Sequence, residues 1–320
     1  MPDSKVFART VLTEDQTDII HSGQKSKAET RTPAISSLDD FLALIKIGII
    51  KSNLITAFTG VWLALHFGGL SFLENLGTVA LVLCGTAFVI GGAGTLNNYI
   101  DRDIDHLMER TSKRPTVTGR MDSRKVFMLG LGLVSAGTVL LAFTTVSAAL
   151  LGLFGVFAYV VLYTFSKRKL VSNTVIGSIS GAVPPLIGWA AVDANLSLVA
   201  WMLFLVMFIW QPPHFYALAM MRCEEYRKAG IPMLPVVKGF KRTKLSIIFW
   251  VLLLMPLPFF LGELGTPFTV LMLLLNAGWL AFGIYGYKSK DEIKWARRMF
   301  IFSLNYLTII FVSMVIVTLI

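Results

Sequence analysis

The segment LGTVALVLCGTAFVIGGAGTLNNYIDRDID, from Leu76 to Asp105, decides the fold class of this chain. Its first part, up to Leu96, is almost entirely apolar and is long enough to cross a bilayer, which takes about 20 helical residues. Two asparagines then lead into a charged stretch in which three aspartates fall within five residues. The segment therefore predicts a membrane-spanning helix with a polar site at one end.

Apolar stretches of similar length recur along most of the chain. The mean hydropathy is +0.70 and only 15% of residues are charged, which excludes a soluble domain. We expect an all-α, multi-pass membrane bundle with nine transmembrane helices. Their predicted ranges are 42–66, 76–98, 126–146, 148–166, 172–192, 198–220, 245–263, 267–287 and 298–319. Residues 1–40 are polar and predict a flexible cytosolic tail before a single transmembrane domain, 41–320.

The distribution of basic residues predicts the orientation. The connections 67–75, 147, 193–197 and 262–266 contain no Lys or Arg, whereas the alternate connections are rich in both. Because basic loops stay on the cytoplasmic side, we expect a cytoplasmic N-terminus in the cell membrane and an active site on the cytoplasmic side. This topology and attraction to anionic lipids of the bilayer explain the net charge of +10, so no nucleic-acid partner is expected.

Asn97, Asp101 and Asp105 are spaced four residues apart. On a continuous helix this spacing places all three side chains on one face, where the like charges repel. A cation must offset that repulsion, and either Arg102 or Lys113 could serve as a purely structural partner. Alternatively, oxygen ligands without a nearby Cys suit Mg²⁺, which binds one or two carboxylates and completes its shell with water and phosphates.

Basic residues next to the aspartates favour the metal hypothesis. Arg110, Lys113, Arg114 and Arg120 supply a concentrated set of phosphate-binding cations. Carboxylates that hold Mg²⁺, beside cations that bind phosphate, are suited to a diphosphate leaving group. Their position at the end of an apolar bundle predicts a substrate with a diphosphate head and a hydrocarbon tail, such as a polyprenyl diphosphate.

The pattern N-x-x-x-D-x-x-x-D at the end of the second membrane helix resembles the intramembrane aromatic prenyltransferase superfamily. The segments WQPPHF (210–215) and EEYRKAGIPMLPVVKG (224–239) are similar to the haem-farnesylating branch of that superfamily. The resemblance implies that Asn97, Asp101 and Asp105 are catalytic, with Mg²⁺ held on the diphosphate by Asp101 and Asp105.

For the substrates, the resemblance implies farnesyl diphosphate and haem b. The farnesyl group and water would be added at the vinyl group on carbon 2 of haem b, giving the hydroxyethylfarnesyl side chain of haem O. Haem A synthase is the partner that would receive this product. Quinone-forming relatives carry a second aspartate-rich motif where this chain has His214, Glu224 and Glu225. Glu225 is our candidate for completing a second metal shell.

Several further residues have both a functional and a structural interpretation. The resemblance places Lys46, Asn53, Lys167 and Arg168 on the diphosphate side, with Arg110 and Arg114. The lysines could instead extend to the interface, and the cluster at 167–169 could simply reflect topology. His214 follows two prolines; it either binds haem or pairs with a backbone carbonyl that the prolines leave free.

Two other functions remain open from the residues. One is a quinone-pathway prenyltransferase acting on 4-hydroxybenzoate or a naphthoate, which the missing second aspartate motif disfavours. The other is an ion-coupled membrane transporter that uses the aspartates as a relay. Transporter sites lie near the bilayer midplane on interrupted helices, whereas these carboxylates lie at a helix end beside a basic loop.

Overall fold

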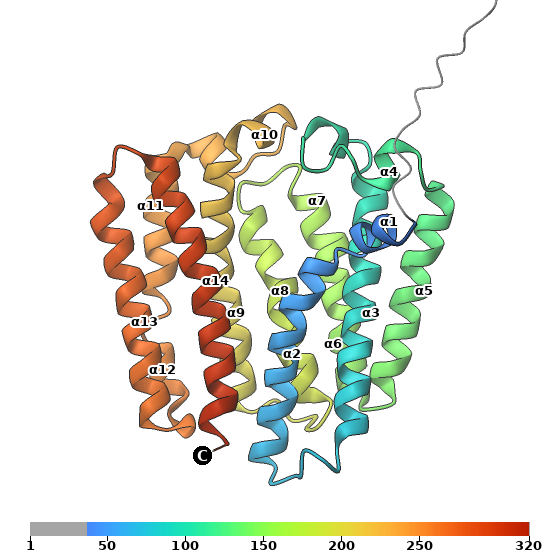
Figure 1. Ribbon diagram of the computed structural model, residues 1–320, viewed down its shortest axis with the longest axis vertical. Helices are drawn as coiled ribbons and strands as arrows, with labels where there is room; N and C mark the ends of the chain where they lie inside the picture. Colours follow the sequence, from blue (N-terminus) through green and yellow to red (C-terminus); the bar gives the residue numbers. More distant parts are fainter. Residues whose placement is uncertain (1–36, 320) are drawn as a thin grey trace, which may run out of the picture. The chain divides into compact units, whose positions relative to one another are not determined.

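The computed structural model describes residues 37–319, which contain helices and no strand. Eight helical segments in this range are long and apolar enough to cross a membrane, and they stand side by side (Figure 1). They are α2 (Ile47–Phe67), α3 (Leu76–Asp101), α5 (Ser123–Ala142), the run of α6 (Val146–Phe157), η2 (Ala158–Tyr163) and α7 (Thr164–Ser166), α9 (Leu198–Met221), α11 (Leu234–Leu252) with α12 (Leu257–Phe260), α13 (Thr266–Tyr285) with η4 (Gly286–Lys288), and α14 (Glu292–Val317). The predicted all-α membrane bundle is confirmed.

The one predicted span outside these eight, 172–192, corresponds to helix α8 (Asn173–Ala190). It carries polar residues such as Asn173, Thr174 and Ser178, all of which are buried. Its neighbours are α2, α9 and α6. Helix α8 therefore faces protein along much of its length, which explains why its sequence is less apolar than that of the lipid-facing helices.

Three predicted boundaries differ from the structure. The first span is divided at Lys46, whose φ of 58° interrupts the chain between α1 (Ser37–Leu44) and α2. Helix α1 also takes in residues 37–40 of the predicted tail, and residues 1–36 of that tail lie outside the described range. The predicted loop 221–244 is largely helical: it forms α10 (Cys223–Lys228) and the start of α11, with a break at Gly239 (φ 72°).

Helices α3 and α5 approach so closely that glycine is required at their crossing points. A Cβ atom on Gly137 would lie 2.7 Å from the carbonyl oxygen of Gly85, and one on Gly92 would lie 2.8 Å from that of Gly130. These contacts involve backbone, which cannot move aside as a side chain can. Small residues at such positions let membrane helices pack by van der Waals contact, and here they fix the helix that carries Asn97 and Asp101.

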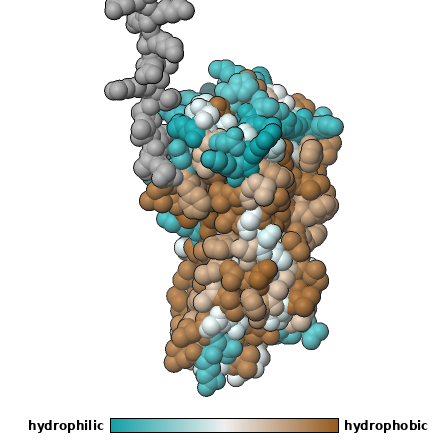
Figure 2. Space-filling view, turned by 90° about the vertical axis from the view of Figure 1, so that its right-hand side faces the viewer, coloured by the Kyte–Doolittle hydropathy of each residue, from teal (hydrophilic) through white to brown (hydrophobic). Residues whose placement is uncertain are grey.

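The surface of the bundle agrees with a membrane environment. In Figure 2, apolar residues form a belt between hydrophilic residues at the two ends, with the larger hydrophilic group at the end where α3 finishes. On α5, Met128 and Val139 are 64% and 54% exposed. Exposure of such side chains is expected where lipid, not water, is the solvent.

The two long loops at the aspartate end pack against each other. Met108, from the loop after α3, forms an apolar cluster with Ala229, Ile231 and Met233, from the segment between α10 and α11. Tyr226 of α10 packs against this cluster. The loops therefore form a folded cap over one end of the bundle.

We predict that Gly137→Ala destabilises the protein by about 1–3 kcal/mol, because the added methyl group meets backbone atoms of α3. The matched control is Gly132→Ala on the same helix, where a Cβ meets nothing within 4 Å. That change should leave the thermal unfolding midpoint in detergent unchanged or slightly higher, because alanine favours helix over glycine. Equal midpoints for the two variants would contradict the close crossing.

Candidate active site

Asn97, Asp101 and Asp105 are all buried, with exposed fractions of 3%, 1% and 2%. Asn97 and Asp101 lie on the last two turns of α3, as predicted. The helix ends at Asp101, however, and Asp105 begins the short helix η1 (Asp105–Leu107). The expectation of one continuous helical face is therefore wrong for Asp105.

Each buried carboxylate has a cationic partner. Lys167 forms a salt bridge with Asp101, and Arg168 lies 3.3 Å from the other oxygen of the same carboxylate. Arg114 Nη1 donates to Asp105 Oδ2 over 2.5 Å. Two separate segments thus neutralise the pair: the end of α7, and the residue before α4 (Pro115–Thr118).

The structural partners considered from sequence, Arg102 and Lys113, do not make these contacts. Arg102 donates to the carbonyl of Tyr99 and lies 4.3 Å from the centre of that ring. Lys113 offers its carbonyl oxygen to Arg120. The cations that pair with the buried aspartates are instead among the residues predicted to bind diphosphate, and Lys167 is more than sixty positions away in sequence.

Lys46 reaches the site from the turn before α2. Its Nζ donates to Asn97 Oδ1 over 2.5 Å and to the hydroxyl of Tyr159 over 3.1 Å. Asn97 Nδ2 in turn donates to Thr164 Oγ1 over 3.0 Å. Lys46 is the one non-glycine residue with positive φ among those described, a conformation that costs about 1–3 kcal/mol. The turn before α2 therefore directs an ammonium group at the motif.

A π-helix, η2, pairs Tyr163, whose pattern Y-x-x-x-K-R with Lys167 and Arg168 resembles the diphosphate-side motif of the family, with Tyr159, which sequence reasoning did not assign. Tyr159 and Tyr163 stack with ring centres 5.5 Å apart, and Lys167 lies 5.8 Å from the centre of the Tyr163 ring. Tyr159, Tyr163 and Lys167 are spaced four residues apart, and this spacing is the signal that could have identified Tyr159. π-helical turns are rare and occur frequently at functional sites.

The frame around the site is fixed by further polar contacts. Arg120 binds both carboxylate oxygens of Asp40 at 2.8 and 3.0 Å, which joins the loop after α4 to α1. Asn98 Nδ2 donates to the carbonyl of Leu44 over 2.9 Å.

Outside the spans, hydrogen bonds from Arg168 hold the pKa of Asp103 below its ordinary value, so this exposed carboxylate stays ionised.

Some predicted residues are not joined to the aspartates by a direct contact. Asn53 Nδ2 donates to Ile49 O within α2. Glu225 accepts from Arg222 over 2.6 Å on α10. Arg110 is exposed.

The donor set at the site consists of oxygen atoms. Within residues 37–319, no three Asp, Glu, His or Cys side chains gather into a metal-holding group. The two buried carboxylates and Asn97 Oδ1 nevertheless fit a hard cation such as Mg²⁺, which needs few protein ligands when phosphate oxygens complete its shell. The cations Lys46, Arg114 and Lys167 provide the matching positive charge for a phosphate.

His214 is on α9 and contacts α14. Its ring stacks between Trp210 and Phe300, with ring centres 4.6 Å apart on each side, and it is 8% exposed. Its Nδ1 lies 2.7 Å from Ser303 Oγ, and that hydroxyl donates to the carbonyl of Phe300 over 2.6 Å. Because the hydroxyl proton is engaged in this way, the arrangement favours the tautomer in which Nδ1 donates to Ser303 Oγ and Nε2 carries the lone pair.

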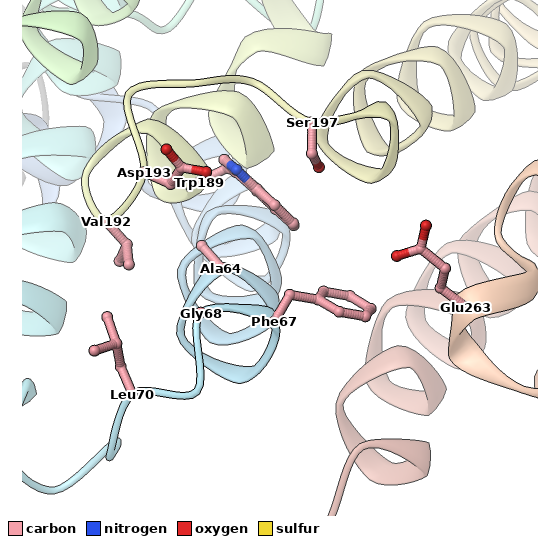
Figure 3. Close-up of a pocket in the computed structure, with 9 residues that line it drawn as sticks. All are labelled: Ala64, Phe67, Gly68, Leu70, Trp189, Val192, Asp193, Ser197 and Glu263. Carbon is pink, nitrogen blue, oxygen red and sulfur yellow. The ribbon is translucent and has the colours of Figure 1, made fainter.

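A cavity of about 380 Å³ lies at the opposite end of the bundle (Figure 3). Phe67 and Trp189 border it, and the carboxylates of Asp193 and Glu263 flank it from separate segments. The residues lining it include no Lys or Arg and none of the motif residues. It therefore does not share the chemistry of the aspartate site.

The chain is similar to known proteins. The sequence profile of the UbiA prenyltransferase family matches residues 53–305. The chain is 59% identical over 300 residues to a protoheme IX farnesyltransferase of Geobacillus sp. (strain WCH70), covering 93% of this chain and 96% of the relative. It is 60% identical over 281 residues to protoheme IX farnesyltransferase 2 of Bacillus subtilis (strain 168), covering 88% and 92%.

A solved structure shares the fold. A UbiA homolog from Archaeoglobus fulgidus bound to DMAPP and Mg²⁺ superimposes with a TM-score of 0.64 at 16% identity, covering 86% of this chain and 99% of that one. From the matched profile and the two relatives together, the chain belongs to the UbiA prenyltransferase family, in the branch of the protoheme IX farnesyltransferases.

Proposed function

We propose that this chain converts haem b to haem O by transferring the farnesyl group of farnesyl diphosphate to the vinyl group at carbon 2, with addition of water. The observation that carries the proposal is the buried pair Asp101 and Asp105, each held by a cation at one end of an apolar bundle. The names of the relatives at 59% and 60% identity support the choice of haem as acceptor.

The basic residues of the site suit the diphosphate of the donor. Lys46, Arg114 and Lys167 each hold a carboxylate or amide oxygen. An incoming diphosphate offers the same kind of acceptor, so these cations can bind phosphate oxygens by exchanging partners. Arg110 and Arg168 add positive charge nearby, and Asn53 lies two turns deeper on α2 than Lys46, toward the hydrocarbon tail.

We propose that Asp101 and Asp105 hold Mg²⁺, with Asn97 orienting the bound group. When bound, Mg²⁺ supplies neutralisation of the charge that develops on a diphosphate leaving group. Support comes from the UbiA homolog of the same fold that binds DMAPP and Mg²⁺. Glu225 is our proposed further ligand. To bind the metal, its carboxylate has to release Arg222, from which it accepts a hydrogen bond.

In the proposed reaction, the bond between farnesyl carbon 1 and the diphosphate oxygen breaks, and both electrons leave with the diphosphate. The vinyl group of haem b supplies the electron pair of the new carbon–carbon bond. Water then adds to the cation next to the porphyrin and releases one proton, leaving a hydroxyl group. No strong base is needed, since the final deprotonation is from an oxonium ion.

We propose that His214 binds or orients the haem. The hydrogen bond to Ser303 and the stacking by Trp210 and Phe300 hold the imidazole in one orientation and one tautomer. A ring nitrogen with a free lone pair is a ligand for haem iron, and a hydrogen bond at the other nitrogen fixes such ligands.

We further propose that the protein lies in the cell membrane. The end of the bundle that carries the aspartates would face the cytoplasm, since the connections at the other end lack Lys and Arg. Transfer of the product to a haem A synthase stays a prediction of the resemblance. The quinone and transporter alternatives lose support, because the relatives named above are haem farnesyltransferases.

A direct assay tests the reaction. Purified full-length protein with haem b, farnesyl diphosphate and Mg²⁺ should yield a more hydrophobic haem whose mass rises by one farnesyl group and one hydroxyl group. Mass spectrometry of the extracted haem measures this. Prenylated 4-hydroxybenzoate with no modified haem, under the same conditions, would refute the assignment.

The metal ligands are tested by removing single charges. Asp101→Asn or Asp105→Asn should lower kcat on the order of 100-fold or more, because the carboxylate charge that holds the metal is lost. Glu109→Gln is the matched control, since this carboxylate lies in the same connection and is exposed. Chelation should abolish wild-type turnover and added Mg²⁺ should restore it. Near-normal kcat in both buried-site variants, once folding is verified by size exclusion, would refute their role.

The haem contact is tested by absorption. Adding haem b to wild-type protein should shift the Soret band, and His214→Ala should lose that shift because the ligating nitrogen is gone. Ser303→Ala should weaken haem affinity by roughly tenfold, as expected for loss of a residue that orients a metal ligand. His106→Ala, at an exposed residue of η1, is the control. An unchanged shift in His214→Ala would exclude ligation by this residue.

A further inference from the structure

A basic cavity lies apart from the aspartate site. It has a volume of about 340 Å³ and lies between α11 and the turn that joins α13 to α14. Four lysines line it, Lys241, Lys244, Lys288 and Lys290, together with a single acid, Glu292. In Figure 1, α11, α13 and α14 stand on the opposite side of the bundle from α3 and α5. The residues that line this cavity include none assigned to the reaction.

One lysine of the cavity is structural and the other three are not. Lys244 is 2% exposed; its Nζ donates to the carbonyls of Tyr287 and Ser289 at 3.2 Å and lies 3.4 Å from Glu292. This contact uses the acid of the cavity. Lys241, Lys288 and Lys290 are exposed and form no ion pair within residues 37–319. Three uncompensated positive charges therefore face one cavity.

The surface next to the cavity is apolar. Lys241, Leu245 and Phe249 are spaced four residues apart on α11 and so follow one stripe of the helix. Leu245 is 42% exposed and Phe249 54% exposed. At the end of α13, Ile284 and Tyr285 are 56% and 91% exposed. The stripe thus begins with the charged Lys241 and continues as apolar surface. This order matches the charged headgroup and the apolar acyl chains of a lipid.

We propose that this cavity binds the phosphate headgroup of an anionic phospholipid, whose acyl chains lie along the exposed apolar stripe of α11. Basic pockets between helices at the headgroup level are suited to such lipids, and each lysine near the surface adds to the attraction. An exposed tyrosine beside the pocket fits the same level, where amphipathic rings concentrate. A soluble phosphate would use the lysines but not the stripe.

Lipid titration of the full chain in mild detergent tests this, with binding followed by native mass spectrometry. Phosphatidylglycerol should bind saturably, whereas phosphatidylcholine and glycerol phosphate should bind much more weakly. The triple variant Lys241→Gln, Lys288→Gln, Lys290→Gln should weaken phosphatidylglycerol binding by at least about tenfold. The matched control removes three exposed charges elsewhere at the same end of the bundle: Arg124→Gln, Lys125→Gln, Lys228→Gln. It should bind like the wild type.

Three outcomes would overturn the proposal. Equal weakening in both triple variants would show attraction by net charge and no site. Glycerol phosphate binding as tightly as the lipid would identify a soluble-anion pocket. Displacement of the lipid by farnesyl diphosphate at equimolar concentration would assign the cavity to the reaction itself. Haem farnesylation by the triple variant is measured separately, so failure of the lipid site and failure of the proposed function are distinguishable.

Discussion

Two carboxylates, Asp101 and Asp105, are withdrawn from water at the end of an apolar bundle, and the surrounding architecture is arranged to make that possible. An isolated buried charge is expensive, and removing one partner of a buried ion pair costs about 3–5 kcal/mol. Lys167 and Arg114 therefore must be present together with the aspartates, and they come from two different connections. The ends of α3 and α7 and the loop before α4 are held at one point by this requirement.

The same requirement reaches into the packing of the helices. Helix α3 can place Asp101 reproducibly only because α5 presses against it through glycines, including Gly92 and Gly137. Helices α8 and α2 cross by a similar device: a Cβ on Gly188 would lie 2.1 Å from the carbonyl oxygen of Ala57 on α2. Close backbone contact replaces the hydrophobic effect, which is weak between helices that already lie in lipid.

Much of the fold and the first elements of the site follow from sequence, for clear reasons. Spans about 20 residues long carry a strong hydropathy signal, and the step of four from Asn97 to Asp101 does lie on a helix. The position of Asp105 could not be obtained this way, because the periodicity gives no sign that α3 stops at Asp101. Nor could the partner of Asp101 be chosen, since Lys167 competes with nearer cations and only the tertiary fold selects it. The π-helix that aligns Tyr159 with Tyr163 leaves no mark in composition.

The left-handed turn at Lys46 limits what evolution or design can place at this position. Glycine would relieve the backbone at once but would remove the ammonium group that Asn97 and Tyr159 accept from. A β-branched residue would tolerate neither the backbone conformation nor the polar surroundings. Arginine would keep the charge, yet its planar guanidinium is larger and more rigid than the compact ammonium group that bonds both Asn97 and Tyr159. One position thus couples chain geometry to charge, and the two cannot be optimised independently.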